Sequence, residues 1–295
     1  MKSFRSLIYW GAICSLVCFS CKDTQNNDPK QEDLAALQAD VLPEGVIPFH
    51  YLNDTLKMIM IDAVLNGTDS ITLGWDTGAG ATYIPLAFQD SLEGKDSITI
   101  NLGGQTVIYR EKINFSDKKP LENGDSIILA NWDLFRDQIV EVSYDRKFLR
   151  VLNSTDRLDE YECIPYKYNA KNGHLYIPIS VCIQGKVFHI EDALIDTGFN
   201  VAFVVYEKDI PGIDFPPRKE LPKEDFRIRL DRKILADTIK AAGVFTTDMD
   251  IHIATPNPKR IGKMEYPNLL GNEFFSHFSV VFDFKNQNLY LKPLT

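Results

Sequence analysis

Short runs of alternating apolar and polar residues follow one another along the chain from about residue 46 to its end. Turn-forming dipeptides separate these runs, for example Asn66-Gly67, Gly103-Gly104 and Gln184-Gly185. Alternation with a period of two residues is typical of β-strands with one buried face, and such dipeptides are typical of tight hairpins. Helical periodicity is scarce. Residues 230–242 are one helical candidate, with a pair of strands as the alternative. The pattern therefore predicts an all-β fold.

This arrangement of strands occurs twice. In each half, two strands around a turn glycine lead to the same tripeptide, Asp76-Thr77-Gly78 in the first half and Asp196-Thr197-Gly198 in the second. The halves also end alike, because residues 128–151 resemble residues 269–291 in their order of apolar runs and turns. Repetition of one supersecondary plan predicts two similar lobes. We place the first lobe at residues 46–155 and the second at residues 156–295, with the join near residues 153–163.

The first 45 residues differ from the rest. Lys2 and Arg5 precede an apolar run over residues 7–19 that is too short to span a bilayer and fits the hydrophobic region of a signal peptide. The run ends at Ser20-Cys21, and a small residue directly before a cysteine at this boundary resembles the lipobox of bacterial lipoproteins. We therefore expect residues 1–20 to be a signal peptide, Cys21 to be the lipid anchor and residues 21–45 to be a hydrophilic tether.

Export would place the protein in the cell envelope, held to a bacterial membrane by its lipid and facing the periplasm or the outside. An ordinary cleaved signal with incidental cysteines is the alternative. Cys163 and Cys182 are the cysteines left in the folded part. An exported compartment allows them to form a disulfide, and two separate buried thiols are the alternative.

Composition narrows the function classes. The 295 residues include 44% hydrophobic and 25% charged residues, which excludes collagen-like, coiled-coil, disordered and polytopic membrane proteins. The 32 basic and 41 acidic residues give a formal net charge of −9, and no basic stripe is visible, so nucleic-acid binding is not expected. The five histidines are scattered, without a zinc-binding pattern, and no serine-nucleophile or dinucleotide motif occurs. We therefore expect neither a metal nor a cofactor.

The repeated tripeptide is the strongest chemical signal. An aspartate that ends an apolar strand and is followed by Thr-Gly lies in a tight turn at the rim of a sheet, where glycine allows the backbone to fold sharply behind the carboxylate. A single turn of this kind supplies one carboxylate. Two lobes that face each other would bring Asp76 and Asp196 together.

These motifs resemble those of the bilobal aspartic peptidases, the pepsin and retropepsin type. The residues that carry the resemblance are Trp75 to Ala79, Thr82 to Ile84, Leu194 to Gly198, Leu269 to Gly271 and the closing run from Phe278 to Asp283. The resemblance covers roughly residues 46–295 and implies two similar retropepsin-like β-barrel lobes with an active-site cleft between them. It also implies a monomer, because one chain supplies both aspartates.

The resemblance implies an aspartic endopeptidase that acts on peptides or proteins. Asp76 and Asp196 would be catalytic and would activate a shared water, with one proton held between two carboxyl groups that cannot both ionise. Thr77 and Thr197 would brace the two turns beside Gly78 and Gly198. A hairpin that covers the substrate should follow the first turn, and Gly103-Gly104 is the candidate for its tip.

Two departures from the family pattern bear on activity. Phe199-Asn200 follows the second tripeptide, where Ser, Thr or Ala is usual, and Ala130 stands in place of the supporting glycine of the first lobe. Because of Phe199, a lobe pair that has lost catalysis and binds a peptide or a partner protein is the main alternative. A further alternative is an envelope β-protein that binds glycans or other ligands and in which the two tripeptides are purely structural.

Overall fold

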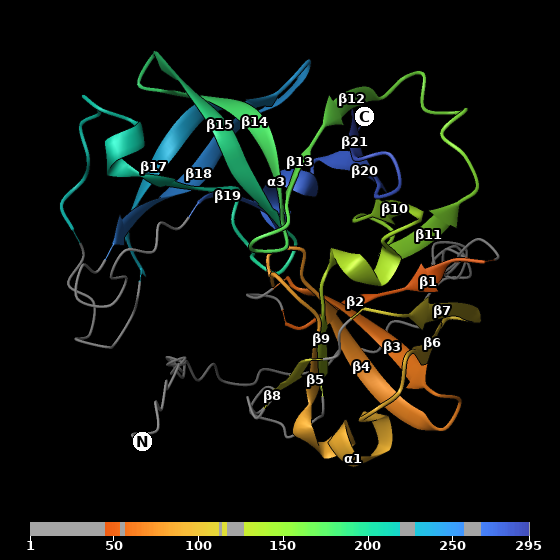
Figure 1. The fold of residues 1–295 in the computed structure, drawn as a ribbon. Helices are drawn as coiled ribbons and strands as arrows, with labels where there is room; N and C mark the ends of the chain where they lie inside the picture. Colours follow the sequence, from red (N-terminus) through yellow and green to blue (C-terminus); the bar gives the residue numbers. More distant parts are fainter. Residues whose placement is uncertain are drawn as a thin grey trace, which may run out of the picture.

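The computed structural model describes residues 45–53, 57–111, 114–116, 127–218, 228–256 and 267–294. These residues form three β-sheets, one in each of two lobes and one that joins the lobes at their base (Figure 1). The predicted signal peptide, Cys21 and nearly all of the predicted tether lie outside the described residues. The helical segments are short: η1 (Leu86–Phe88), α1 (Gln89–Leu92), η2 (Trp132–Phe135), η3 (Glu207–Asp209) and α3 (Asn272–Phe275). No helix of the described chain is long and apolar enough to cross a membrane.

An eight-stranded sheet forms the first lobe. In spatial order its strands are β7 (Gln105–Tyr109), β6 (Ile98–Leu102), β3 (Ile59–Leu65), β4 (Asp69–Trp75), β9 (Ile127–Ala130), β5 (Tyr83–Pro85) and β8 (Asn114–Ser116), and β2 (His50–Tyr51) pairs with β3. Strands β3 and β4 form the predicted hairpin. Asn66 and Gly67 in its turn have φ angles of 49° and 79°, the left-handed conformation that an Asn-Gly turn requires.

The sheet of the second lobe closes on itself. In spatial order its strands are β13 (Lys167–Asn169), β14 (His174–Ile183), β15 (Lys186–Asp196), β19 (Asn268–Gly271), β16 (Phe203–Tyr206), β18 (Val244–Pro256) and β17 (Ile228–Ala241). Strand β17 also pairs with β14, so six of the strands form a barrel. The helical candidate at residues 230–242 is wrong, because this segment lies in β17 and pairs with β18. Ile239 and Ala241 are buried and Lys240 is exposed, which is strand alternation.

The base sheet combines strands from both halves of the chain. Its order is β1 (Ile47–Pro48), β11 (Phe148–Leu152), β10 (Ile139–Ser143), β20 (Phe278–Asp283), β21 (Asn288–Pro293) and β12 (Glu162–Pro165). Strands β10 and β20 pair in antiparallel fashion at its centre, with Val142 opposite Val280. The hairpin turns that follow them place Lys147 and Gln287 at φ angles of 55° and 59°. The two closing segments therefore have the same conformation, and the repeat predicted from the sequence is confirmed.

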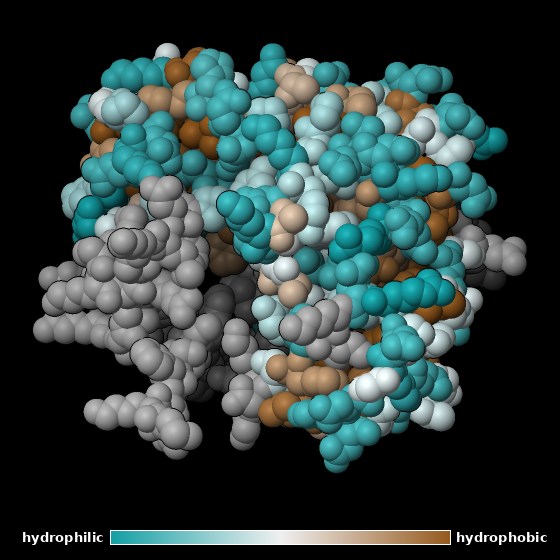
Figure 2. All heavy atoms as spheres, in the orientation of Figure 1, coloured by the Kyte–Doolittle hydropathy of each residue, from teal (hydrophilic) through white to brown (hydrophobic). Residues whose placement is uncertain are grey.

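Aromatic packing ties the strand before the first tripeptide to the base sheet. Trp75 is fully buried, and its ring makes edge contacts with Phe135, Phe282 and Phe284 at centroid distances of 5.8, 5.7 and 6.5 Å. Such aromatic contacts add to the stability that burial of the ring area provides. The position of Asp76 is therefore set by packing that involves both halves of the chain. Outside this core, hydrophilic side chains dominate the visible face of the molecule (Figure 2).

Candidate active site

Each aspartate lies where two parallel strands end side by side. Asp76 follows β4, which runs parallel to β9, and its N–H donates to the carbonyl of Ala130 at 2.8 Å. Asp196 is the last residue of β15, which runs parallel to β19, and it lies opposite Gly271. Both residues are partly exposed, whereas the residue on either side of each is buried. The two lobes thus present equivalent carboxylates at their shared boundary.

Four hydrogen bonds between threonines and backbone join the two turns. The N–H of Thr77 donates to Oγ1 of Thr197, and the N–H of Thr197 donates to Oγ1 of Thr77, both at 3.1 Å. Each hydroxyl then donates across the boundary, that of Thr77 to the carbonyl of Ile195 at 2.8 Å and that of Thr197 to the carbonyl of Trp75 at 3.1 Å. Both threonines have 0% exposure. Because every polar group here is buried and paired, this brace fixes one aspartate relative to the other.

The glycines of the tripeptides leave room for the opposing carboxyl group. A Cβ atom on Gly78 would lie nearer than 3.0 Å to the carboxyl of Asp196, and one on Gly198 would lie equally near to that of Asp76. Each glycine also donates its N–H to Oδ1 of the aspartate in its own turn, Gly78 at 2.9 Å and Gly198 at 3.0 Å. Glycine is therefore required at both positions by close approach.

The two carboxyl groups titrate as a pair. Burial raises the pKa of both, and the pKa of Asp196 is raised further by the charge of Asp76 and by a hydrogen bond to it. That same hydrogen bond, together with the Gly78 N–H, opposes the rise in the pKa of Asp76. Because the two carboxyl groups interact strongly, their protons leave in two separate steps that belong to the pair.

A buried asparagine supports the second turn from behind. Asn272, the first residue of α3, donates its amide N–H groups to the carbonyls of Thr197 and, at 2.9 Å, of Lys57. Its Oδ1 accepts the hydroxyl of Tyr144 at 2.8 Å. Lys57 belongs to the first lobe and Tyr144 to the base sheet, so one side chain links three parts of the molecule. Asn272 lies in no motif of the sequence that predicts this role.

The prediction that Ala130 stands in place of the supporting glycine of the first lobe is wrong by one residue. Since Trp75 pairs with Ala130 as Ile195 pairs with Leu270, the residue equivalent to Gly271 is Asn131, not Ala130. Gly271 is held tightly, because a Cβ atom there would lie 2.5 Å from the carbonyls of Phe199 and Val201. At the equivalent position, Asn131 donates its N–H to Oγ1 of Thr82 at 3.0 Å, and its Oδ1 caps η2 by accepting the N–H of Trp132.

Phe199 leaves the second turn intact. Its N–H donates to the carbonyl of Asp196, as the N–H of Ala79 does to that of Asp76. Its ring is partly buried against a small apolar cluster that includes Val201, Val204 and Tyr206. The bulky side chain is therefore accommodated by apolar contacts within the second lobe.

The Gly103-Gly104 turn does not cover the pair Asp76 and Asp196, which we call the dyad. Gly103 packs against Val46, Ile47 and Pro48, and the side chain of Gln105 donates to the carbonyl of Gly45. The turn thus lies beside β1 at the base of the first lobe (Figure 1). A Gly-Gly dipeptide predicted the hairpin correctly, but it carries no information about what the turn packs against.

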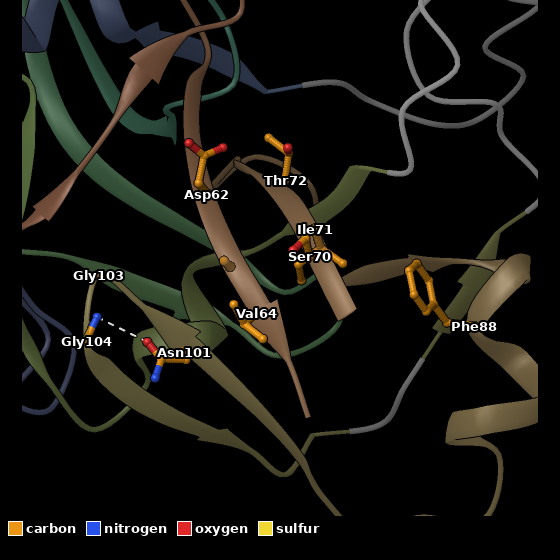
Figure 3. Close-up of a pocket in the computed structure, with 10 residues that line it drawn as sticks. Asp62, Val64, Ser70, Ile71, Thr72, Phe88, Asn101, Gly103 and Gly104 are labelled. Atoms are coloured by element: carbon orange, nitrogen blue, oxygen red, sulfur yellow. Dashed lines mark hydrogen bonds between the residues drawn. The ribbon is translucent and has the colours of Figure 1, made fainter. Parts of the chain in front are cut away.

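Two surface hollows among the described residues have linings that do not include the two aspartates. One, of about 790 Å³, lies on the first lobe between the strands that carry Asp62, Thr72 and Asn101, with Phe88 at its edge (Figure 3). The other, of about 410 Å³, includes Cys163 and His189. Neither includes Asp76 or Asp196.

Among the described residues, no group of histidine, cysteine, aspartate or glutamate side chains could hold a metal ion. Cys163 and Cys182 are both free thiols.

No protein-family model and no curated protein matches the chain. Among solved structures, it is similar to the crystal structure of the aspartic proteinase from Irpex lacteus, with a TM-score of 0.51 and 11% sequence identity. The match covers 85% of this chain and 97% of that chain. At this identity the likeness concerns the fold, which is mostly β, with a closed six-stranded barrel in one lobe and a half-barrel sheet in the other, a pepsin-like arrangement.

Proposed function

We propose that the chain is an aspartic endopeptidase in which Asp76 and Asp196 activate a water molecule between them. The observation that carries the proposal is the threonine brace, which holds two half-buried carboxyl groups against each other's glycine turns. A carboxyl pair that shares one proton offers a base and an acid at the same place, as peptide hydrolysis without a metal or a covalent intermediate requires.

In the proposed reaction the resting pair holds one proton on Asp196, and Asp76 is the ionised partner. Asp76 takes a proton from the water, and the water oxygen forms a bond to the peptide carbonyl carbon. Asp196, which is protonated, donates its proton to the carbonyl oxygen. Collapse of the tetrahedral intermediate breaks the C–N bond. The amine nitrogen takes the proton held by Asp76 as it leaves. One hydroxyl of the tetrahedral carbon gives its proton to Asp196 and becomes the carbonyl oxygen of the new carboxyl group. The dyad thus ends in its starting state.

The test is cleavage of a mixed peptide library by the purified protein over acid to neutral pH. Asp76→Asn and Asp196→Asn are run beside the wild type, because asparagine preserves shape and removes the titratable oxygen. We expect wild-type cleavage and a loss of at least 10³-fold in both variants, on the order of the loss seen when an essential acid or base is removed. Activity that survives in either variant would refute the shared-water mechanism.

Catalytic inactivity is the second candidate, and one observation favours it. Phe199 carries no hydroxyl next to Asp196, so in the described structure the backbone donor to the Asp196 carboxyl is the N–H of Gly198. A folded wild type that binds peptides from the library and cleaves none over the whole pH range would establish a peptide-binding function instead.

Export and lipid attachment at Cys21 belong to the same proposal and rest on the N-terminal sequence. A lipid anchor would hold the lobes at a membrane of the cell envelope as a monomer that acts on peptides or proteins there. Incorporation of a labelled fatty acid into the wild type, and its absence from a Cys21→Ser variant, would support the anchor. A variant that is labelled equally would contradict it.

A further inference from the structure

A buried hydrogen-bond network lies behind the turn that carries Asp76. Its centre is the carboxyl group of Asp133 in η2. Oδ1 of this group accepts the hydroxyl of Thr82 at 2.7 Å, and Oδ2 accepts the hydroxyl of Tyr109, the last residue of β7, at 3.1 Å. Thr82 and Tyr109 are each only 2% exposed. The network therefore joins η2 to the end of β7 and to the segment that follows the first tripeptide.

The hydroxyl of Thr82 also holds a peptide unit that contacts the backbone of Asp76. The N–H of Asn131 donates to Oγ1 of Thr82 at 3.0 Å. The carbonyl of the same peptide unit belongs to Ala130, and it accepts the N–H of Asp76 at 2.8 Å. The peptide unit is planar and rigid, so its N–H and carbonyl directions are coupled. A change in the bond to Thr82 is therefore transmitted to the bond with Asp76.

The second lobe holds the equivalent peptide in another way. Thr82 and Ala202 are equivalent, since each lies six residues after the aspartate of its lobe. In the second lobe the carbonyl of Ala202 accepts the N–H of Gly271 at 3.2 Å. In the first lobe the carbonyl of Thr82 instead accepts the side-chain amide of Asn114 at 3.2 Å. The hydroxyl of Thr82 thus takes the place that a backbone carbonyl has in the second lobe.

The carboxyl group of Asp133 orients this hydroxyl. A hydroxyl has one proton and two lone pairs. Because the Thr82 hydroxyl donates its proton to Asp133, it presents a lone pair to the N–H of Asn131. We propose that Thr82 and Asp133 are positioning residues, which orient the peptide between Ala130 and Asn131 and thereby fix the backbone of Asp76. The effect of this positioning on peptide cleavage rests on the proposed function.

The charges around Asp133 leave this role to the two hydroxyl groups. Burial raises the pKa of Asp133. The hydrogen bonds from Thr82 and Tyr109 oppose the rise, and so does the charge of Arg136. Arg136 is itself paired with Glu111 at 2.9 Å, and the charge of Glu111 raises the pKa of Asp133. Since the two members of this ion pair act in opposite directions, the two hydroxyl groups are the main contacts that favour the ionised carboxylate.

The test compares variants of the purified protein in matched pairs. Asp133→Ala removes the acceptor of the Thr82 hydroxyl, and Asp133→Asn keeps an oxygen that can accept it. Thr82→Val removes the hydroxyl, and Thr82→Ser keeps it. Leu92→Ala controls for a general loss of stability, because Leu92 is 1% exposed and belongs to α1, at the end of the first lobe away from the second lobe (Figure 1).

Two quantities are measured for each variant. The first is the ¹H shift of the Asp76 backbone amide, assigned by its loss from the aspartate-labelled spectrum in Asp76→Asn. This shift reports on the hydrogen bond to Ala130, which a merely structural role of Asp133 would not move. The second is the pair of constants kcat and KM for peptide cleavage, which separates positioning of the reacting groups from substrate binding.

We expect Asp133→Ala and Thr82→Val to move the Asp76 amide proton upfield, because a longer hydrogen bond deshields it less. In these two variants kcat should fall by about 10- to 100-fold with KM nearly unchanged, since a small displacement of a catalytic group lowers the rate by such factors. Asp133→Asn, Thr82→Ser and Leu92→Ala should keep the wild-type shift.

An Asp76 amide shift that is equal in all variants would overturn the inference, and so would a shift that Leu92→Ala changes as much as Thr82→Val does. If Asp133→Ala does not fold, the comparison of Thr82→Val with Thr82→Ser decides. If the wild type cleaves no peptide, the proposed function fails, and the amide shifts still decide whether Thr82 and Asp133 position Asp76.

Discussion

Replacing Thr197 with valine removes a hydroxyl that is buried between the lobes while nearly preserving the shape of the side chain. In the native structure this hydroxyl accepts the N–H of Thr77 and donates to the carbonyl of Trp75, both at 3.1 Å. The substitution removes a hydrogen-bond partner from each of these two buried backbone groups. At about 1–3 kcal/mol for each group, the expected loss in free energy of unfolding is about 2–6 kcal/mol.

Urea unfolding followed by tryptophan fluorescence measures this loss, because Trp75 and Trp132 are both buried near the lobe boundary. Thr197→Ser is the matched control, since it keeps the hydroxyl and loses only a methyl group, at a cost of about 1 kcal/mol. The slope of free energy against urea should stay the same in both variants, which shows that the comparison is of stability alone. A valine variant that is as stable as the serine variant would refute the role assigned to the brace.

Three further predictions concern Asp196, Asn272 and the Gly103-Gly104 turn. The pKa of Asp196 is raised in the folded state, so ionisation of this carboxyl destabilises the folded protein. Asp196→Asn should therefore raise Tm at neutral pH, and the gain should vanish at pH values below the ordinary aspartate pKa. A gain in Tm that is equal at all pH values would contradict this. Asn272→Leu should cost about 3–5 kcal/mol in urea unfolding, because it leaves the carbonyls of Lys57 and Thr197 and the hydroxyl of Tyr144 unpaired. Gly104→Ala should lower stability by about 1 kcal/mol, since Gly104 has a φ of 87°, and should leave kcat/KM unchanged; a fall in kcat/KM would restore the turn as a cover.

The features that the sequence predicted are those carried by local chemistry. The order of strands, turns and tripeptides repeats because the same local pattern builds the same turn in each lobe. Asp76 and Asp196 therefore occupy equivalent positions at the ends of their strands. The assignment of Ala130 was wrong by one residue, since an apolar pattern does not distinguish the last strand residue from the helix cap at Asn131.

The features that the sequence did not predict depend on how the lobes pack. His174 is one of five histidines without a motif, and its close approach to Gly80 exists only because β14 lies against the other lobe. The same holds for Asn272, whose partners Lys57 and Tyr144 are far from it in the chain. Gly103-Gly104 forms a turn, as predicted, and its neighbours are decided by the N-terminal strand β1.

The central claim is that Asp76 and Asp196 share one proton as a single unit. The most direct measurement is a ¹³C NMR titration of the Asp196 carboxyl in the wild type and in Asp76→Asn. The charge of Asp76 contributes to the raised pKa of Asp196, so removing that charge should lower the pH at which Asp196 loses its proton. Titration of Asp196 at the same pH in both proteins would show that the two carboxyl groups are independent and would contradict the account.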